Sequence, residues 1–164
     1  MKKAEIIRPI FDEYFMFIAA GSSLRSTCLR RRVGAVITID RHPISTGYNG
    51  SPQRTKHCSE IGCLREKLGI PSGERGELCR GAHAEQNVIA FAAQYGISVK
   101  GATMYVTNTP CSHCAKSIIN SGIVKVVFDG DYPDKIGRSL LREAEIKLIK
   151  YSGVAPVEYF KKYS

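Results

Sequence analysis

The sequence predicts an α/β fold in which helices cover both faces of a five-stranded mixed sheet, giving three layers in the order α-β-α. Two observations carry this prediction. Five β-rich runs are separated along the chain by turns or by segments with apolar residues at helical spacing. Their order is helix, strand, strand, and then helix and strand in alternation, which is typical of a mixed sheet covered by helices.

The first helix is predicted over residues about 5–22, because apolar side chains recur there at the spacing of one buried helical face. These side chains are Ile7, Ile10, Phe11, Tyr14, Phe15, Phe17 and Ile18. After a loop, RSTCLRR, a β-rich run begins at Val33, and HPISTGYNG is predicted as a second strand that ends in a turn. Arg41 and His42 join the two strands, which makes the pair a hairpin.

Residues about 50–81 contain no long periodic segment and hold three of the six cysteines. A loop of that length inside a compact domain is expected to be functional or held by an additional constraint. We therefore interpret this stretch as a cysteine-bearing insert in a single domain that spans residues 1–164.

The second half of the chain alternates helices and strands. A helix is predicted from His83 to Gly96 and another from CSHC to Gly122, each ended by its glycine. The remaining predicted elements are the strands ATMYVTN, IVKVVFDG and IKLIKYS, a helix over residues about 134–144, and a short helix in VEYFKKYS.

The chain has 164 residues and a net charge of +9, from 24 basic and 15 acidic side chains. This charge favours an anionic partner such as a nucleotide, although a solvated basic surface explains it equally well. No apolar stretch approaches the length of a membrane span, and the N-terminal apolar run contains Asp12 and Glu13 and lacks a small-residue cleavage site. We therefore expect a cytoplasmic protein without membrane contact, in which cysteines are metal ligands or free thiols rather than disulfides.

Three residues in two distant motifs are candidate ligands of one zinc ion. Cys111 and Cys114 are three residues apart, so a helix that begins at Pro110 places both sulfurs on one face of its first turn, where the helix N-terminus favours thiolates. His83 opens another helix and adds an imidazole. Three protein ligands leave the fourth tetrahedral position for water, which is typical of catalytic rather than structural zinc.

Glu85 follows His83 by two residues and is expected to act on that water as a general acid and base without binding the metal. Each motif alone is weak, because a lone C-x-x-C can be a redox pair and a histidine at a helix start is often a cap. The joint pattern is stronger, because each part begins a helix and a β-rich strand lies between them.

Four segments carry a resemblance to a known family: VGAVI, STGYNGSP, HAEQNVI and GATMYVTNTPCSHCAKSIINSGI. With these motifs the sequence resembles the cytidine-deaminase superfamily over roughly residues 10–150, and within it the deoxycytidylate (dCMP) deaminases. H-A-E and P-C-x-x-C occur throughout the superfamily, whereas GYNGSP and the cysteine-bearing insert are more specific to the branch that acts on nucleoside monophosphates. The resemblance implies a cytidine-deaminase-like fold and a single deaminase domain of the CMP/dCMP type.

The resemblance also implies an activity. It is the zinc-dependent hydrolysis of dCMP to dUMP and ammonia, which supplies a precursor for dTMP synthesis. His83, Cys111 and Cys114 would hold the zinc, and Glu85 would be the proton donor and acceptor. The implied partners are the small-molecule substrate dCMP and further copies of the chain, as a hexamer or a dimer, rather than nucleic acid. Regulated members bind a dCTP effector with magnesium. Some of them have an arginine at the position of Gln94 in this chain, and the difference puts nucleotide regulation at this position in doubt.

The resemblance suggests further substrate contacts. The backbone at Ala84 would help to hold the base, and Tyr132 would lie near the substrate. Asn49 would hydrogen-bond the sugar, although an Asn-Gly pair is also a common turn former. Arg25 and Ser26 are the candidates for the phosphate.

Next to these phosphate candidates, the run Arg30, Arg31 and Arg32 is interpreted as a solvated basic face.

The other four cysteines, Cys28, Cys58, Cys63 and Cys79, could close a structural zinc site with no open position. The resemblance places Cys28 and Cys58 at ligand positions of a second zinc in some family members. Cys63 and Cys79 complete the set by inference, with His57 as an alternate ligand. Such a metal would offset the entropy of ordering the insert, and free thiols are the alternative.

Two other functions remain open from the sequence. A tRNA or single-stranded nucleic-acid deaminase would share the zinc core, but the chain shows no clear platform of aromatic residues for stacking bases. A non-catalytic zinc module that binds nucleic acid would not need Glu85.

Overall fold

A computed structural model describes residues 7–163 and contains a five-stranded sheet in the order β2-β1-β3-β4-β5. The strands are β1 (Gly34–Ile39), β2 (His42–Tyr48), β3 (Thr103–Asn108), β4 (Lys125–Gly130) and β5 (Lys147–Lys150). Strand β1 is antiparallel to both β2 and β3, whereas β3, β4 and β5 run parallel. The prediction of a mixed sheet is confirmed.

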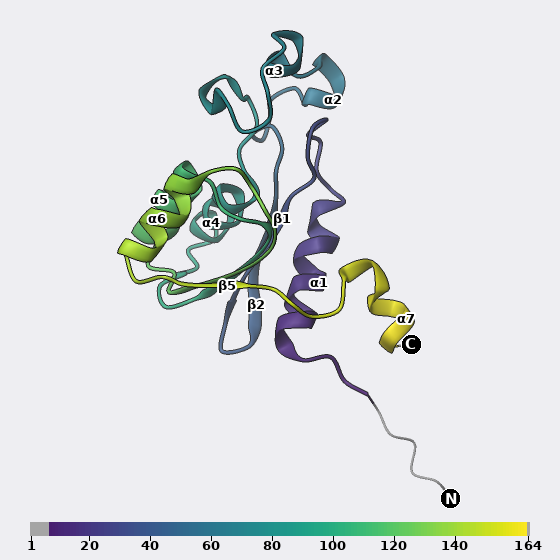
Figure 1. Ribbon diagram of the computed structural model, residues 1–164, viewed down its shortest axis with the longest axis vertical. Helices are drawn as coiled ribbons and strands as arrows, with labels where there is room; N and C mark the ends of the chain where they lie inside the picture. Colours follow the sequence, from purple (N-terminus) through teal and green to yellow (C-terminus); the bar gives the residue numbers. More distant parts are fainter. Residues whose placement is uncertain (1–6, 164) are drawn as a thin grey trace, which may run out of the picture.

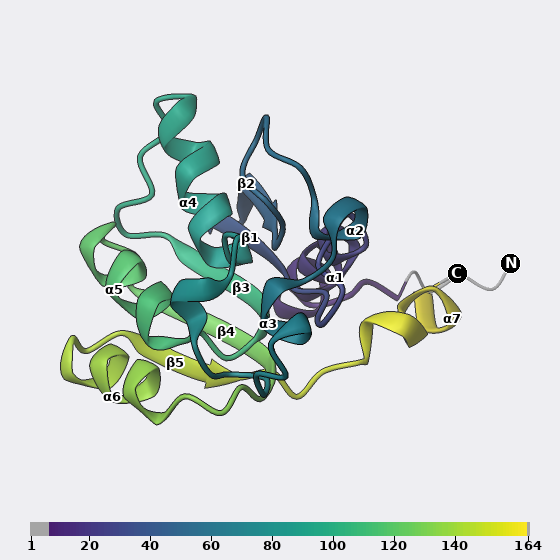
Figure 2. The ribbon, with the colours of Figure 1, turned by 90° about the horizontal axis from the view of Figure 1, so that it is seen from above.

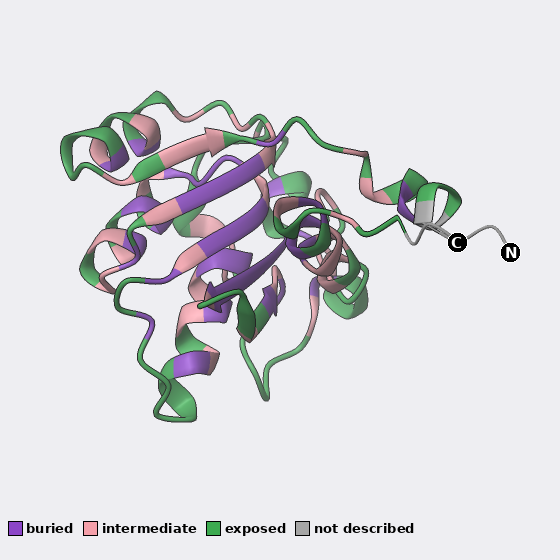
Figure 3. Ribbon diagram, turned by 90° about the horizontal axis from the view of Figure 1, so that it is seen from below, coloured by how far each residue is buried: buried purple, intermediate pink, exposed green. Residues whose placement is uncertain are grey.

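Helices cover both faces of the sheet, which confirms the predicted three layers (Figure 1). On one face lies α1 (Phe11–Ser23), and on the other lie α4 (Ala84–Gln94), α5 (Ser112–Asn120) and α6 (Lys135–Glu143). Each interface has its own apolar core. Met16, Val36 and Val127 are buried on the α1 side, and Val88 and Ile118 are buried on the other. The buried strands therefore form the middle layer, as Figure 3 shows.

The first helix begins later than predicted. It starts at Phe11, and Ile7 and Ile10, which were assigned to its buried face, are 65% and 63% exposed. Pro9 accounts for the absence of helix before it, because a proline biases the preceding residue away from helical geometry. Glu13 accepts a hydrogen bond from the backbone N–H of Ile10 at 3.3 Å, which caps the helix at this position. Positions 5 and 6 of the predicted helix lie outside the described residues.

The hairpin is confirmed, but its turn lies one residue earlier than predicted. Asp40 and Arg41 occupy the turn with φ of 47° and 63°, and His42 is already the first residue of β2. Two consecutive residues with positive φ are what a two-residue turn between twisted antiparallel strands requires.

The insert lies at one end of the sheet, beyond the end of β2 (Figure 1), so that in the view from above it lies in front of the strands (Figure 2). It contains only short helices: α2 (Cys58–Ile61), α3 (Leu64–Lys67) and the 3-10 turn η1 (Gly76–Leu78). Its two ends meet in an isolated bridge, in which the N–H groups of Gly50 and Ala82 each donate to the carbonyl of the other at 3.1 and 2.9 Å. The insert is thus a loop that is closed at its base and contains short helical turns.

The C-terminal segment forms a 3-10 turn, η2 (Pro156–Glu158), and the short helix α7 (Tyr159–Tyr163), which agrees with the predicted short helix. The ring of Tyr159 stacks on that of Phe17 in α1, with centroids 4.4 Å apart. Among the helices that the structure describes, we find none long and apolar enough to span a membrane.

Candidate active site

His83 is held at the N-terminus of α4 by its neighbours. It is the N-cap residue, with extended backbone angles, and its N–H donates to Oε1 of Gln86 at 3.0 Å. Asn87, one turn further, donates from Nδ2 to the carbonyl of Tyr48 at the end of β2, at 2.7 Å. This bond ties the start of α4 to the sheet. The sequence motifs gave Asn87 no role, although an amide on the first turn of a helix is a recognisable candidate for such a tie.

The two candidate cysteines lie at the start of α5. The helix begins at Ser112 with Cys111 as its N-cap, which is one residue later than the predicted CSHC start and leaves Pro110 outside the helix. The side chain of Asp134 fixes this end, accepting from the N–H of Ser112 at 2.7 Å and from that of Gly137 at 2.9 Å. One carboxylate therefore joins the starts of α5 and α6. An aspartate directly before a helix is a standard N-cap signal, so the sequence indicates the role of Asp134 at α6. Its hydrogen bond to the start of α5 is not apparent from the sequence.

Gly137 allows α6 to lie directly against the backbone that carries Cys111. A β-carbon at this position would stand 2.6 Å from the carbonyl oxygen of Pro110 and 2.7 Å from the carbonyl carbon of Cys111. Such distances are too short for any side chain, so the close packing of α5 and α6 requires glycine here.

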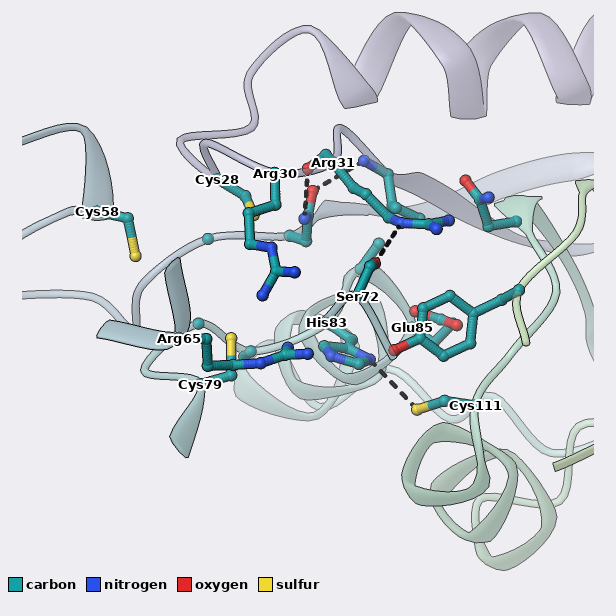
Figure 4. Close-up of a pocket in the computed structure, with 18 of the residues that line it drawn as sticks. Cys28, Arg30, Arg31, Cys58, Arg65, Ser72, Cys79, His83, Glu85 and Cys111 are labelled. Carbon is teal, nitrogen blue, oxygen red and sulfur yellow. Dashed lines mark hydrogen bonds between the residues drawn. The ribbon is translucent and has the colours of Figure 1, made fainter. Parts of the chain in front are cut away.

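The two helix starts bring the three predicted zinc ligands together. Nδ1 of His83 lies 3.3 Å from Sγ of Cys111 and 3.3 Å from Sγ of Cys114 (Figure 4 shows the first of these contacts). Tetrahedral zinc with ordinary bond lengths separates a nitrogen and a sulfur ligand by about 3.6 Å. Among the described residues this is the one group of histidine, cysteine or acidic side chains whose ligand atoms all lie within 4.8 Å of one another. The geometry fits one zinc ion.

The electrostatics of these side chains favour a thiolate. The Cys114 thiol donates a hydrogen bond to Cys111, and this bond, assisted by His83, lowers the pKa of Cys111 to about 4. A hydrogen bond to Cys111 likewise raises the pKa of His83. A cation that replaces the shared protons would bind to groups already arranged as its ligands.

Glu85 lies beside the three ligands and is only 4% exposed. Burial raises its pKa from the ordinary carboxyl value to about 7, against the opposing charge of His83. It is the second residue of α4, where the helix N-terminus faces the same space as the ligands. A carboxyl group in this position can hold or release a proton near neutral pH.

His83, Glu85 and Cys111 line one open cavity. Of the predicted substrate contacts, Asn49, Ala84 and Tyr132 line the cavity. Arg25 is exposed and Ser26 half-buried, and neither belongs to the cavity wall. Contacts of all five with a substrate stay predictions.

Asn49 has a structural task in this arrangement. Its Oδ1 accepts from the N–H of Val33 at 2.8 Å and from Oγ of Ser26 at 2.7 Å, and its Nδ2 donates to the carbonyl of Arg31 at 2.9 Å. The amide therefore holds the loop between α1 and β1 in place. A hydrogen bond from Asn49 to a sugar stays a prediction.

The interpretation of the arginine run as a solvated face is wrong for two of its three members. Arg30 and Arg31 line the cavity, whereas Arg32 is exposed. A third arginine in the cavity wall, Arg65 of α3, was not recognised in the sequence. No local pattern marks it, because its position depends on how the insert folds at the end of the sheet.

The four remaining cysteines also reach this cavity. Cys28, Cys58, Cys63 and Cys79 are free thiols in its wall. Burial raises the pKa of the Cys58 thiol. Charge interactions with the other three cysteines raise it further, so the four thiols are near enough to affect one another's ionisation. Their sulfurs do not form a group as tight as that around His83 among the described residues. The alternate ligand is His57, whose Nδ1 is hydrogen-bonded to Oγ1 of Thr27 at 3.0 Å.

Comparison with known proteins agrees with the geometry. Residues 9–129 match the family described as the cytidine and deoxycytidylate deaminase zinc-binding region. The deoxycytidylate deaminase of Schizosaccharomyces pombe is 34% identical in an alignment covering 92% of this chain and 48% of the yeast protein. That of Mycobacterium phage D29 is 40% identical, over 74% of this chain and 95% of the phage protein. The chain thus spans about half the length of the yeast relative.

Solved structures agree as well. The dCMP deaminase of the cyanophage S-TIM5, in complex with dCMP and dUMP, has a TM-score of 0.74 with this chain and 26% sequence identity. The alignment covers 88% of this chain and 99% of the phage protein. The cytidine-deaminase-like fold and the resemblance carried by the sequence motifs are both confirmed.

Proposed function

The chain belongs to the cytidine and deoxycytidylate deaminase zinc-binding family, and from this premise we propose that it hydrolyses dCMP to dUMP and ammonia. The observation that carries the proposal is the buried carboxyl group of Glu85 beside the cluster of His83, Cys111 and Cys114 at the end of an open cavity. The enzyme would be a hydrolase of a cyclic amidine C–N bond and would supply a precursor for dTMP.

His83, Cys111 and Cys114 would hold the zinc ion. When bound, zinc supplies a water molecule whose pKa is lowered to about 7. Glu85 then does the proton transfers. It accepts a proton from the attacking water as the water oxygen bonds to the ring carbon that bears the amine, and it delivers that proton to the adjacent ring nitrogen. As the C–N bond breaks, Glu85 passes the second proton of the water to the departing amine, which leaves as ammonia. The backbone at Ala84, which lines the cavity, would help to hold the base.

A second, structural zinc is part of the proposal. Cys28, Cys58, Cys63 and Cys79 are the proposed ligands, with His57 as an alternate. Support comes from four free thiols in one cavity wall and from a long insert that has only short helices of its own. Metal binding would draw the four sulfurs closer together and offset the entropy of ordering the insert.

A substrate panel tests the reaction. We expect the purified, zinc-loaded protein to release ammonia from dCMP much faster than from CMP, dCTP or deoxycytidine. Adding dCTP with magnesium, or dTTP, tests for regulation in the same assay, and size-exclusion chromatography with light scattering tests for the proposed homo-oligomer. Equal rates with deoxycytidine and dCMP would refute the monophosphate substrate. Deamination of a tRNA anticodon stem without activity on free nucleotides would replace the proposal with a nucleic-acid deaminase.

A further inference from the structure

Two arginines of the active-site cavity carry N–H groups without partners. Nε of Arg65 and Nη1 of Arg30 are both buried and have no hydrogen-bond partner among the residues that the structure describes. Arg65 as a whole is only 7% exposed. Burying a guanidinium donor without a partner is costly, so such groups in a cavity indicate a ligand that accepts hydrogen bonds.

The charges of these arginines are also uncompensated. Among the ion pairs of the described residues, none includes Arg30, Arg31 or Arg65. The cavity wall contains three arginines but only one carboxylate, that of Glu85. A buried positive charge without a counter-charge is stabilised by a bound anion.

Each guanidinium is anchored by one nitrogen and has another, buried nitrogen that lacks a hydrogen-bond partner. Nη2 of Arg30 donates to the carbonyl of Ile70 at 2.9 Å, and Nη2 of Arg65 donates to the carbonyl of Pro71 at 3.3 Å. The anchoring carbonyls belong to consecutive residues of the insert. Since both side chains are already held in place, little rotational entropy remains to be lost when an anion binds.

The two arginines lie at the end of the cavity beyond the zinc cluster. In Figure 4, Arg65 extends from the insert toward His83, and Arg30 descends into the same space from the loop before β1. Cys111 and Glu85 lie on the opposite side of His83 in this view. A ligand whose reactive ring contacts Glu85 would therefore place its other end near Arg30 and Arg65.

We propose that Arg65 of the insert, together with Arg30, binds the 5′-phosphate of the substrate, so that the cysteine-bearing insert determines the selectivity for nucleoside monophosphates. This inference rests on the proposed function and refines it. A guanidinium fork matches phosphate oxygens in geometry as well as charge, and it binds them more tightly than a neutral donor does. The insert would thus have a task at the catalytic site in addition to any structural metal.

The test measures kcat/KM for dCMP and for deoxycytidine in four variants. Arg65→Gln and Arg30→Gln are each expected to lower kcat/KM for dCMP by about 10- to 100-fold while leaving that for deoxycytidine within about twofold. Arg65→Lys keeps the charge but loses the fork, so we expect an intermediate loss. Arg32→Gln is the matched control, because it removes the same charge from an exposed neighbour, and it should leave both values unchanged.

Three outcomes would overturn the inference. If Arg65→Gln lowers kcat/KM equally for dCMP and deoxycytidine, Arg65 is a structural residue of the insert. If it changes neither value, Arg65 does not bind the phosphate. If Arg32→Gln lowers kcat/KM for dCMP as much as Arg65→Gln does, the arginines act only through the net positive charge of the protein. Calorimetric binding of dUMP and deoxyuridine separates this inference from the proposed function. A wild-type protein that deaminates neither substrate refutes the function, whereas a preference for dUMP that Arg65→Gln abolishes still supports the phosphate site.

Discussion

At the scale of single residues, the site depends on side chains that combine a ligand position with a structural anchor. His83 and Cys111 are both N-cap residues, so each ligand leaves the backbone where a helix has its free N–H groups. Glu85 differs, because it is buried with its pKa raised to about 7, and its proposed task is proton transfer rather than structural support.

Replacing the Glu85 carboxyl by an amide is expected to stop proton transfer while keeping the zinc. Glu85→Gln preserves the shape of the side chain but cannot carry a proton between water and base. We expect kcat to fall by about 10²- to 10⁴-fold. The measurement is kcat together with zinc content per chain. Glu143→Gln, which removes the same charge from an exposed position of α6, is the control. Substantial turnover by Glu85→Gln would end its assignment as the proton carrier.

At the scale of elements, two helix N-termini meet at one point. Helix α5 directly follows β3, and α4 begins where the insert returns to the sheet. Both helix dipoles place partial positive charge at the metal ligands, which favours thiolates there. Asp134 joins α5 to α6, and Asn87 joins α4 to β2, so the two starts are held on a common framework.

The contact between β2 and α4 requires a glycine. A β-carbon on Gly47 would stand 2.6 Å from the backbone nitrogen of Val88 and 2.8 Å from the carbonyl oxygen of Ala84. Gly47→Ala is therefore expected to push α4 from the sheet and to lower the free energy of unfolding by about 1–3 kcal/mol. Urea unfolding followed by circular dichroism measures this loss.

The control for this prediction is another glycine with free space around it. A β-carbon on Gly21, inside α1, would meet no atom of another element within 4 Å. Gly21→Ala should therefore stabilise the protein by about 0.5–1 kcal/mol, because alanine loses less conformational entropy in a helix. If the two variants had the same free energy of unfolding, the prediction that the close contact at Gly47 excludes a β-carbon would be wrong.

At the scale of the whole molecule, the catalytic cavity forms between the sheet and the insert. The insert is largely exposed and has short helices, so its own packing gives it little stability. The loop before β1 is tied to it by contacts such as that of Arg31, whose Nε donates to Oγ of Ser72 at 3.1 Å. The folding of the insert and the completion of the cavity are therefore linked.

Removal of metal is expected to loosen the insert before the rest of the fold. Treatment with a chelator should abolish turnover and expose residues 51–81 to a protease, with fragments identified by mass spectrometry. Cys58→Ser should lose about one zinc ion per chain relative to wild type and show the same cleavage, while the ligands around His83 keep the other zinc. An unchanged zinc content in Cys58→Ser would leave the four cysteines as free thiols.

The sequence by itself determined the order of elements, the mixed sheet and the zinc cluster. Strand and helix periodicities are local, and His83, Glu85, Cys111 and Cys114 belong to short motifs whose spacing implies their chemistry. Errors at the element ends came from local effects that periodicity does not contain, such as Pro9 before α1 and the N-cap geometry of Cys111.

Only the tertiary structure decided how the insert takes part in the site. Arg65 has no sequence signal, because its burial and its unpartnered N–H depend on how the insert that carries it folds at the end of the sheet. Arg30 and Arg32 are equivalent as letters in a basic run, but one points into the cavity and the other into solvent. Burial depends on the packing of distant segments, so a linear pattern of charges cannot separate a binding side chain from a solvated one.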